Sequence, residues 1–142
     1  MTNHITTTWL GGKKFDSTNP SGNKLIIEAT PENGEQAEGL RPKALMLSSL
    51  AGCSGLDVAS LIKKMKLDVA DFKIEIDAEL TEEDPKYYHK VDVYFHFYGD
   101  NLNEKKLQRA VDLSVEKYCG VMEMFRHFAK VKVETHFHKL DN

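Results

Sequence analysis

The chain has 142 residues, of which 41% are hydrophobic and 29% charged, and its 19 Lys and Arg residues against 22 Asp and Glu give a formal net charge of -3. This length is usual for one domain and allows a single hydrophobic core without disulfide bonds, so we expect one domain over residues 1–142. The slightly acidic balance argues against a nucleic-acid partner or an anionic membrane surface.

No signal-peptide pattern opens the chain, and polar residues interrupt its most apolar stretch, Ala44 to Ile62. We therefore expect a buried helix of a cytoplasmic protein rather than a membrane span. In a reducing compartment, two cysteines are more often catalytic, redox-sensing or metal-binding than structural. The interrupting residues are Ser48, Ser49, Ser54, Asp57 and Ser60.

Residues 5–29 have the pattern of an antiparallel meander. Alternating Ile5, Thr7 and Trp9 predict a strand, and turn signals at residues 11–12 and 19–22 separate it from two further strands in KKFDST and KLIIEA. The acidic segment that follows, residues 30–39, is typical of an exposed loop.

A long helix is predicted from Pro42 to about Lys66, because proline suits the first position of a helix. Apolar residues occupy almost every face of this helix from Ala44 to Leu61. A helix of this kind is normally covered on all sides, which is difficult in a protein this small. We therefore expect a second subunit to cover it.

The remaining chain predicts two long antiparallel strands, over residues 72–80 and 91–98, and a final strand over residues 130–137. Between them we expect a helix over residues 103–118 and a further helical turn from Cys119. Together the elements indicate an α+β fold. The residues expected on one side of the second helix are Leu107, Ala110, Val111, Ser114 and Tyr118.

Cys53 and Cys119 are the only cysteines, one within the long helix and the other where two helices meet. A pair of thiols can reduce a peroxide: a thiolate attacks one oxygen, and a second thiol condenses with the sulfenic acid that results. The structural alternative is that both cysteines are small buried hydrophobic residues without a chemical role.

A reactive Cys53 needs a nearby positive charge, because an apolar setting raises the pKa of a thiol. The dipole of an unbroken helix acts only within its first turn, and Cys53 lies about 16 Å along it at 1.5 Å per residue. Asp57, on the same stripe as Cys53, would oppose ionisation. Among the three arginines, Arg41 lies nearest the helix, and Lys43 is a further candidate.

His136 and His138 would share one face of the last strand, as metal ligands often do. The sequence places no third ligand with them, and two isolated cysteines do not form a zinc site. We therefore expect no metal and no cofactor.

The run PKALMLSSLAGCSGLDVASLIKK resembles the signature helix of the OsmC/Ohr superfamily, and EKYCGVMEMF resembles the segment with that family's second cysteine. The order of elements is also similar over essentially the whole chain. This resemblance implies an intertwined homodimer in which sheets wrap around central buried helices. It further implies that Cys53 attacks an organic hydroperoxide and Cys119 resolves the product, and that dithiols, including protein-bound lipoyl groups in some members, reduce the disulfide.

Two departures from the family pattern concern the activating charges. The peroxidase members have a glutamate directly after the helix-starting proline, where this chain has Lys43, and they use an arginine from the region before the helix, where this chain has none before Arg41.

Two functions follow as hypotheses. The first is a thiol-dependent peroxidase for organic hydroperoxides in oxidative stress defence. The second is a non-catalytic dimeric module that binds an apolar small molecule.

Overall fold

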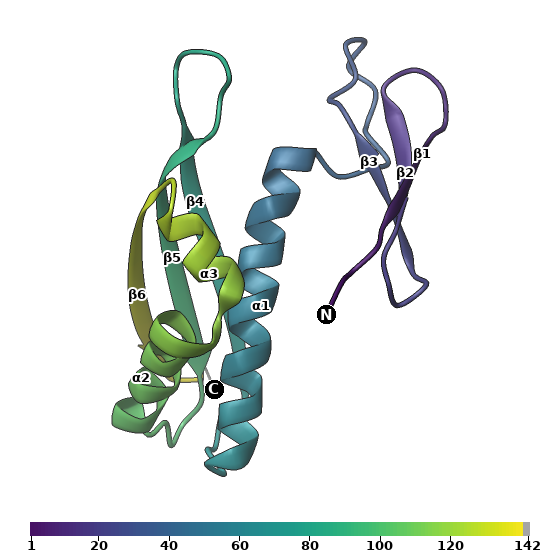
Figure 1. Ribbon diagram of the computed structural model, residues 1–142. Coiled ribbons are helices and arrows are strands. Elements are labelled where there is room, and N and C mark those ends of the chain that lie inside the picture. Colours follow the sequence, from purple (N-terminus) through teal and green to yellow (C-terminus); the bar gives the residue numbers. More distant parts are fainter. Residues whose placement is uncertain (141–142) are drawn as a thin grey trace. The chain divides into compact units, whose positions relative to one another are not determined.

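The structure is a computed structural model, and it describes residues 1–140. The chain forms two compact units, one from Met1 to Met46 and the other from Leu47 onward. Figure 1 shows the strands and helices of both. The expectation of a single domain over residues 1–142 stays a prediction.

The first unit is a three-stranded antiparallel sheet, as the turn signals predicted. Its strands are β1 (Thr6–Trp9), β2 (Lys14–Thr18) and β3 (Lys24–Glu28), paired in sequence order. Gly11 and Gly12 make the first turn with φ values of 100° and 55°, a region that glycine enters without steric cost. The meander prediction is confirmed.

The acidic loop after β3 returns to the same sheet and is held there. The Glu28 carboxylate accepts the backbone amides of Glu38 and Gly39 at 2.9 and 3.1 Å, and Leu40 forms a bridge to Ile27. Gly39 has no room for a side chain, since a Cβ there would lie 2.7 Å from Ile26 Cγ2. The loop is mostly exposed, as expected, and its end is fixed to β3.

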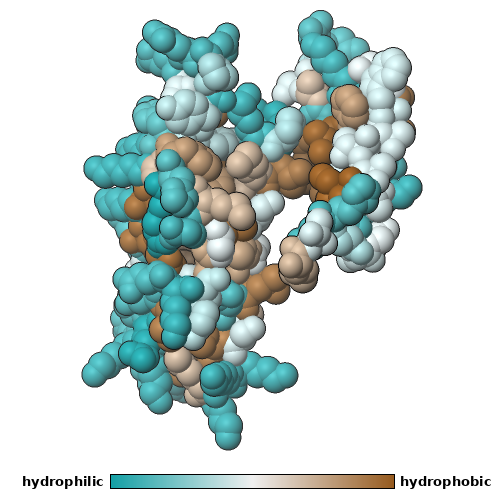
Figure 2. Space-filling model, viewed as in Figure 1, coloured by the Kyte–Doolittle hydropathy of each residue, from teal (hydrophilic) through white to brown (hydrophobic). Residues whose placement is uncertain are grey.

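Helix α1 (Pro42–Lys64) is one continuous helix that includes Gly52 and Gly55. It is long and apolar enough to cross a membrane by length and composition alone, a test that core helices of soluble proteins also pass. Only 17% of its most apolar stretch is buried within the chain, and Leu56 is 73% exposed. Apolar atoms accordingly lie open over the helices of the second unit in Figure 2. The second unit leaves much of its part of this helix exposed.

The second unit contains a three-stranded mixed sheet. Strand β4 (Asp71–Leu80) pairs antiparallel with β5 (Tyr88–Tyr98), and β5 pairs parallel with β6 (Lys130–His138). The parallel pair needs a long crossover, which the helices between β5 and β6 supply. The alternation read from the sequence is confirmed, because the inward residues of β5 are fully buried: Val91, Val93, Phe95 and Phe97.

The crossover contains α2 (Glu104–Leu113), a π-helical turn η1 (Ser114–Tyr118) and α3 (Gly120–Arg126). Asn103 caps α2 by accepting the amide of Lys106 at 3.1 Å. In Figure 1 the helices lie against one face of the β4-β5-β6 sheet. The predicted α+β class is therefore correct.

The π-helical turn corrects one prediction. A regular helix over residues 103–118 would place Tyr118 beside Ser114 on the buried face, yet Tyr118 is 52% exposed. In the structure the amide of Cys119 donates to the carbonyl of Ser114, five residues earlier, at 2.8 Å. The wider turn moves Tyr118 outward and brings Cys119 onto the buried face.

Strand β5 offers a matched test of this core. Replacing fully buried Phe95 with alanine should lower the free energy of unfolding by about 3–5 kcal/mol, because the substitution removes a large apolar side chain and leaves a cavity. Tyr94→Ala on the outward face should cost clearly less. Urea denaturation followed by circular dichroism measures both, and equal losses would contradict the assigned alternation.

Candidate thiol site

The two cysteines meet in the second unit although they are far apart in the sequence. Cys53 lies in the middle of α1 and is half-buried, and Cys119 lies between η1 and α3 and is 3% exposed. Both are free thiols. Cys53 packs against the buried core that contains Cys119, and its interaction with Cys119 raises the pKa of the Cys119 thiol.

Local structure on both sides explains how the thiols meet. On α1, Leu50, Ser54 and Val58 recur every four residues and form the buried stripe of the helix, with Cys53 beside them. On the other side, η1 ends at Cys119, which takes extended backbone angles (φ -77°, ψ 102°) and becomes the N-cap of α3. The predicted junction of two helices at Cys119 is confirmed.

Two donors point at the sulfur of Cys119. The Ser54 hydroxyl donates to Cys119 Sγ at 3.2 Å, and the backbone amide of Met122 donates to the same atom at 3.3 Å. Burial raises the pKa of the Cys119 thiol, the two donors lower it by less, and Cys53 raises it further. The result is a protonated thiol at neutral pH that is held in a fixed position.

A second buried serine lies beside this pair. The Ser114 hydroxyl lies within donating distance of the Ser54 carbonyl oxygen (3.3 Å) and of Asp57 Oδ2 (3.0 Å). Asp57, which the sequence placed on the stripe of Cys53, is therefore a hydrogen-bond acceptor for Ser114. Ser54 and Ser114 are both fully buried.

Ser54 is a site residue that sequence reasoning missed. The sequence placed Asp57 on the same stripe as Cys53 and counted Ser54 only as an interruption of the apolar run. The available signal was its four-residue spacing from Leu50 and Val58, two apolar residues that the fold buries.

The predicted activating cations lie outside the second unit. Arg41 directly precedes α1, where its carbonyl accepts the amide of Leu45 at 2.8 Å, and both Arg41 and Lys43 are exposed residues of the first unit. Their role at the thiols stays a prediction. The unbroken helix at Gly52 and Gly55 leaves Cys53 far from the positive end of the α1 dipole.

Within the second unit, Arg126 has other partners. Its guanidinium donates to Glu123 at 3.2 Å and to the carbonyl oxygen of Val115. Over residues 1–140, the groups that act on the sulfur of Cys119 belong to Ser54, Met122 and Cys53, and none of them is a lysine or arginine.

The histidine pair considered as metal ligands lies on the outer face of the second sheet. His138 Nε2 lies 2.9 Å from Nδ1 of His96, and His136 pairs with Glu134 at 3.2 Å. Glu75 lies 3.3 Å from the other nitrogen of His96. Across residues 1–140 no group of three or more His, Cys, Asp or Glu side chains has the geometry to hold a metal ion. These contacts account for the histidines as a hydrogen-bonded cluster.

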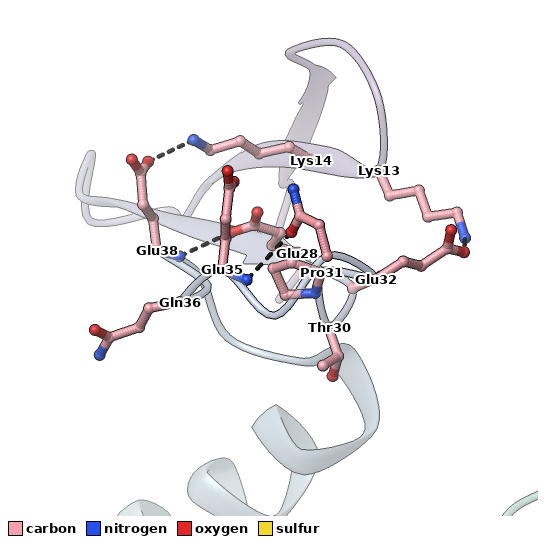
Figure 3. A pocket seen from close by; sticks show the side chains of 11 residues that line it. Lys13, Lys14, Glu28, Thr30, Pro31, Glu32, Glu35, Gln36 and Glu38 are labelled. Carbon is pink, nitrogen blue, oxygen red and sulfur yellow. Dashed lines mark hydrogen bonds and ion pairs between the residues drawn. The ribbon is translucent and has the colours of Figure 1, made fainter.

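A hollow in the first unit is lined by charged residues and not by thiols (Figure 3). Lys14 pairs with Glu38, and Lys13 lies 3.5 Å from Glu32. These charges satisfy one another, and the Lys14–Glu38 contact raises the pKa of the lysine and lowers that of the glutamate. The two ion pairs therefore join the acidic loop to β2 and to the turn before it.

Comparison with known proteins identifies relatives across most of the chain. The family model described as OsmC-like protein matches residues 34–134. Protein YhfA of Escherichia coli (strain K12) is 33% identical over 116 residues, which cover 82% of this chain and 84% of that protein.

Solved structures share the fold. A hypothetical protein from Aquifex aeolicus VF5 has a TM-score of 0.86 and 28% identity, with 99% of each chain covered. The organic hydroperoxide resistance protein OhrB of Bacillus subtilis has a TM-score of 0.65 and 21% identity, with 95% of this chain and 98% of that chain covered.

The different burial of the two thiols predicts different reactivity. A short pulse of iodoacetamide at pH 8 should alkylate Cys53 and leave Cys119 unmodified, because Cys119 is enclosed and its pKa is raised. In denaturant both should react. Mass spectrometry of the digested protein measures the two modifications, and equal labelling in the native state would contradict the assigned burial.

Proposed function

The chain belongs to the OsmC-like protein family, and on that premise we propose that it is a thiol-dependent peroxidase that reduces organic hydroperoxides in oxidative stress defence. The observation that carries this proposal is that α1 packs Cys53 against the buried core that contains Cys119, where the two thiols interact. Structural similarity to proteins named for organic hydroperoxide resistance supports the choice of substrate. The protein acts in this proposal as a cytoplasmic enzyme with one domain over residues 1–142 and no metal or cofactor.

The accessibility of the two thiols supports a different role for each in this proposal. Cys53 is half-buried and can meet a substrate, whereas Cys119 is 3% exposed. This difference supports Cys53 as the proposed nucleophile and Cys119 as the proposed resolving thiol, which Ser54 and the amide of Met122 hold by hydrogen bonds.

The reaction balances with two thiols and one hydroperoxide. The Cys53 thiolate attacks the outer oxygen of the peroxide, the O–O bond breaks, and the alkoxide takes a proton and leaves as an alcohol. Cys119 then attacks the sulfur of the Cys53 sulfenic acid, its proton is lost, and the hydroxyl group leaves as water. A disulfide remains, and two electrons from an external dithiol, such as a lipoyl-type group, restore the thiols.

A positive charge is needed to ionise Cys53, and we propose Arg41 and Lys43 of a second subunit as its sources, because within one chain Cys53 lies about 16 Å along α1 from the start of the helix. Both are exposed and lie directly before or at the start of α1. A guanidinium or ammonium group close to a thiol favours the thiolate.

We also propose that two copies form the intertwined homodimer of the family. The support is the uncovered apolar surface of α1, with Leu56 73% and Met46 46% exposed in one chain. Leaving such large side chains in water is unfavourable by about 1.5–3 kcal/mol each relative to burial. A second copy of α1 would cover them.

The peroxidase proposal predicts turnover. With excess dithiol, the protein should consume many equivalents of cumene or tert-butyl hydroperoxide, and Cys53→Ser should abolish this because no thiolate remains to attack. Peroxide consumption in steady state is the measurement. A non-catalytic module that binds an apolar small molecule would instead show at most one slow oxidation per subunit.

The resolving role of Cys119 predicts a trapped intermediate. Cys119→Ser should leave a sulfenic acid on Cys53 after one equivalent of peroxide, because no neighbouring thiol can condense with it. Dimedone labelling followed by mass spectrometry detects this species. An unreacted Cys53 thiol under the same treatment would contradict the assigned roles.

The dimer proposal predicts the mass of the protein in solution and a substitution that lowers this mass. Light scattering after gel filtration should give twice the chain mass, and Leu56→Glu should shift the protein toward monomer, because a charge would be buried in the interface. Lys105→Glu, a charge change on exposed α2, is the matched control and should stay dimeric. A monomeric wild-type protein would refute the dimer.

A further inference from the structure

The buried hydroxyl of Ser54 is a hydrogen-bond donor to the sulfur of Cys119. Ser54 is fully buried, and its hydroxyl donates to Cys119 Sγ at 3.2 Å. Without this acceptor the buried hydroxyl would have no hydrogen bond to offset the free energy of its desolvation, so the contact stabilises the fold. The sulfur also receives the amide of Met122 at 3.3 Å, so two donors converge on Cys119.

These donors matter most when Cys119 carries a negative charge. A hydrogen bond to an anion is roughly twice as strong as a bond between neutral groups. A disulfide sulfur bears no charge and is a weak acceptor. The two donors therefore stabilise a Cys119 thiolate more than a Cys53–Cys119 disulfide.

The geometry of the two thiols decides which sulfur leaves when the disulfide is reduced. An incoming dithiol can reach half-buried Cys53 and cannot reach Cys119, which is 3% exposed. Attack on Cys53 breaks the S–S bond and leaves the electron pair on Cys119. The rate of thiol–disulfide exchange rises as the leaving thiolate becomes more stable.

We propose that Ser54 is a further catalytic residue, whose hydroxyl stabilises the Cys119 thiolate as it leaves and so makes the Cys53–Cys119 disulfide reducible. This inference rests on the proposed function for the identity of the disulfide. One thiolate of the dithiol bonds to Cys53 Sγ, and the departing Cys119 thiolate takes a proton from solvent. The second thiol of the reductant then loses its proton and attacks the mixed disulfide, which releases the Cys53 thiolate and an oxidised, cyclic reductant.

The experiment separates this step from peroxide chemistry. The disulfide is formed in the full-length protein with diamide, and its reduction by dithiothreitol is followed by quenching and mass spectrometry. Ser54→Ala should slow the reduction on the order of tenfold, as expected for the loss of a hydrogen bond to a charged group. Ser114→Ala removes the other fully buried serine hydroxyl, whose hydrogen bonds go to the Ser54 carbonyl oxygen and Asp57. The disulfide of this control variant should be reduced at the wild-type rate.

A second pair of variants isolates the hydroxyl from packing. Ser54→Thr keeps the hydroxyl, and the valine of Ser54→Val has nearly the same shape as threonine but no hydroxyl. The disulfide of the valine variant should therefore be reduced more slowly than that of the threonine variant, again by on the order of tenfold. In the Cys53→Ser background, Ser54→Ala should also move the ultraviolet titration of Cys119 to higher pH. A merely structural role of Ser54 would leave that titration unchanged.

The outcomes distinguish this inference from the proposed function. Three results would overturn the inference. The threonine and valine variants could be reduced at equal rates, Ser54→Ala and Ser114→Ala could slow reduction equally, or diamide could fail to form the disulfide. A wild-type protein that forms the disulfide with diamide but does not turn over hydroperoxide would refute the peroxidase. The role of Ser54 would still be decided by the reduction rates.

Discussion

The contact between the buried stripe of α1 and the start of α3 is the interaction on which the site depends. Ser54 and Cys53 come from one side of this contact and Cys119 from the other. Each side would be ordinary by itself: a serine and a cysteine on an apolar helix, and a cysteine at a helix start. Packed together, they form a thiol pair in which one sulfur is accessible and the other is enclosed and hydrogen-bonded.

The π-helical turn makes this contact geometrically available. An additional residue in the turn after α2 changes which side chains face the sheet, so that Cys119 points inward and Tyr118 outward. Such turns are rare and often occur at functional sites, because they cost some hydrogen-bond quality and are kept where they position a group. The extended backbone of Cys119 then starts α3 in a direction that brings the amide of Met122 to the sulfur.

Burial and hydrogen bonding act on the pKa of Cys119 in opposite directions, and the balance suits the resolving role that we propose for this thiol. Burial raises its pKa, so the thiol is protonated and stable at rest, while the donors lower the cost of the thiolate when the reaction forms it. The same helix that carries the buried stripe also has a large exposed apolar surface. One stripe of the helix holds the candidate site, and much of the remaining surface of α1 is exposed.

The sequence by itself determined most of the elements, and the exception is the helix predicted over residues 103–118, which ends in a π-helical turn. Period-two alternation in β4 and β5, turn residues around β2 and the proline at the start of α1 follow local rules, and each appeared where the pattern placed it. The sequence also identified both cysteines and, through their flanking residues, the family. Only the tertiary structure decided that Ser54 contacts Cys119, that Tyr118 turns outward and that β6 lies parallel beside β5. These features depend on which distant segments pack together and on a single inserted residue in a helical turn, and neither leaves a periodic signal in the chain.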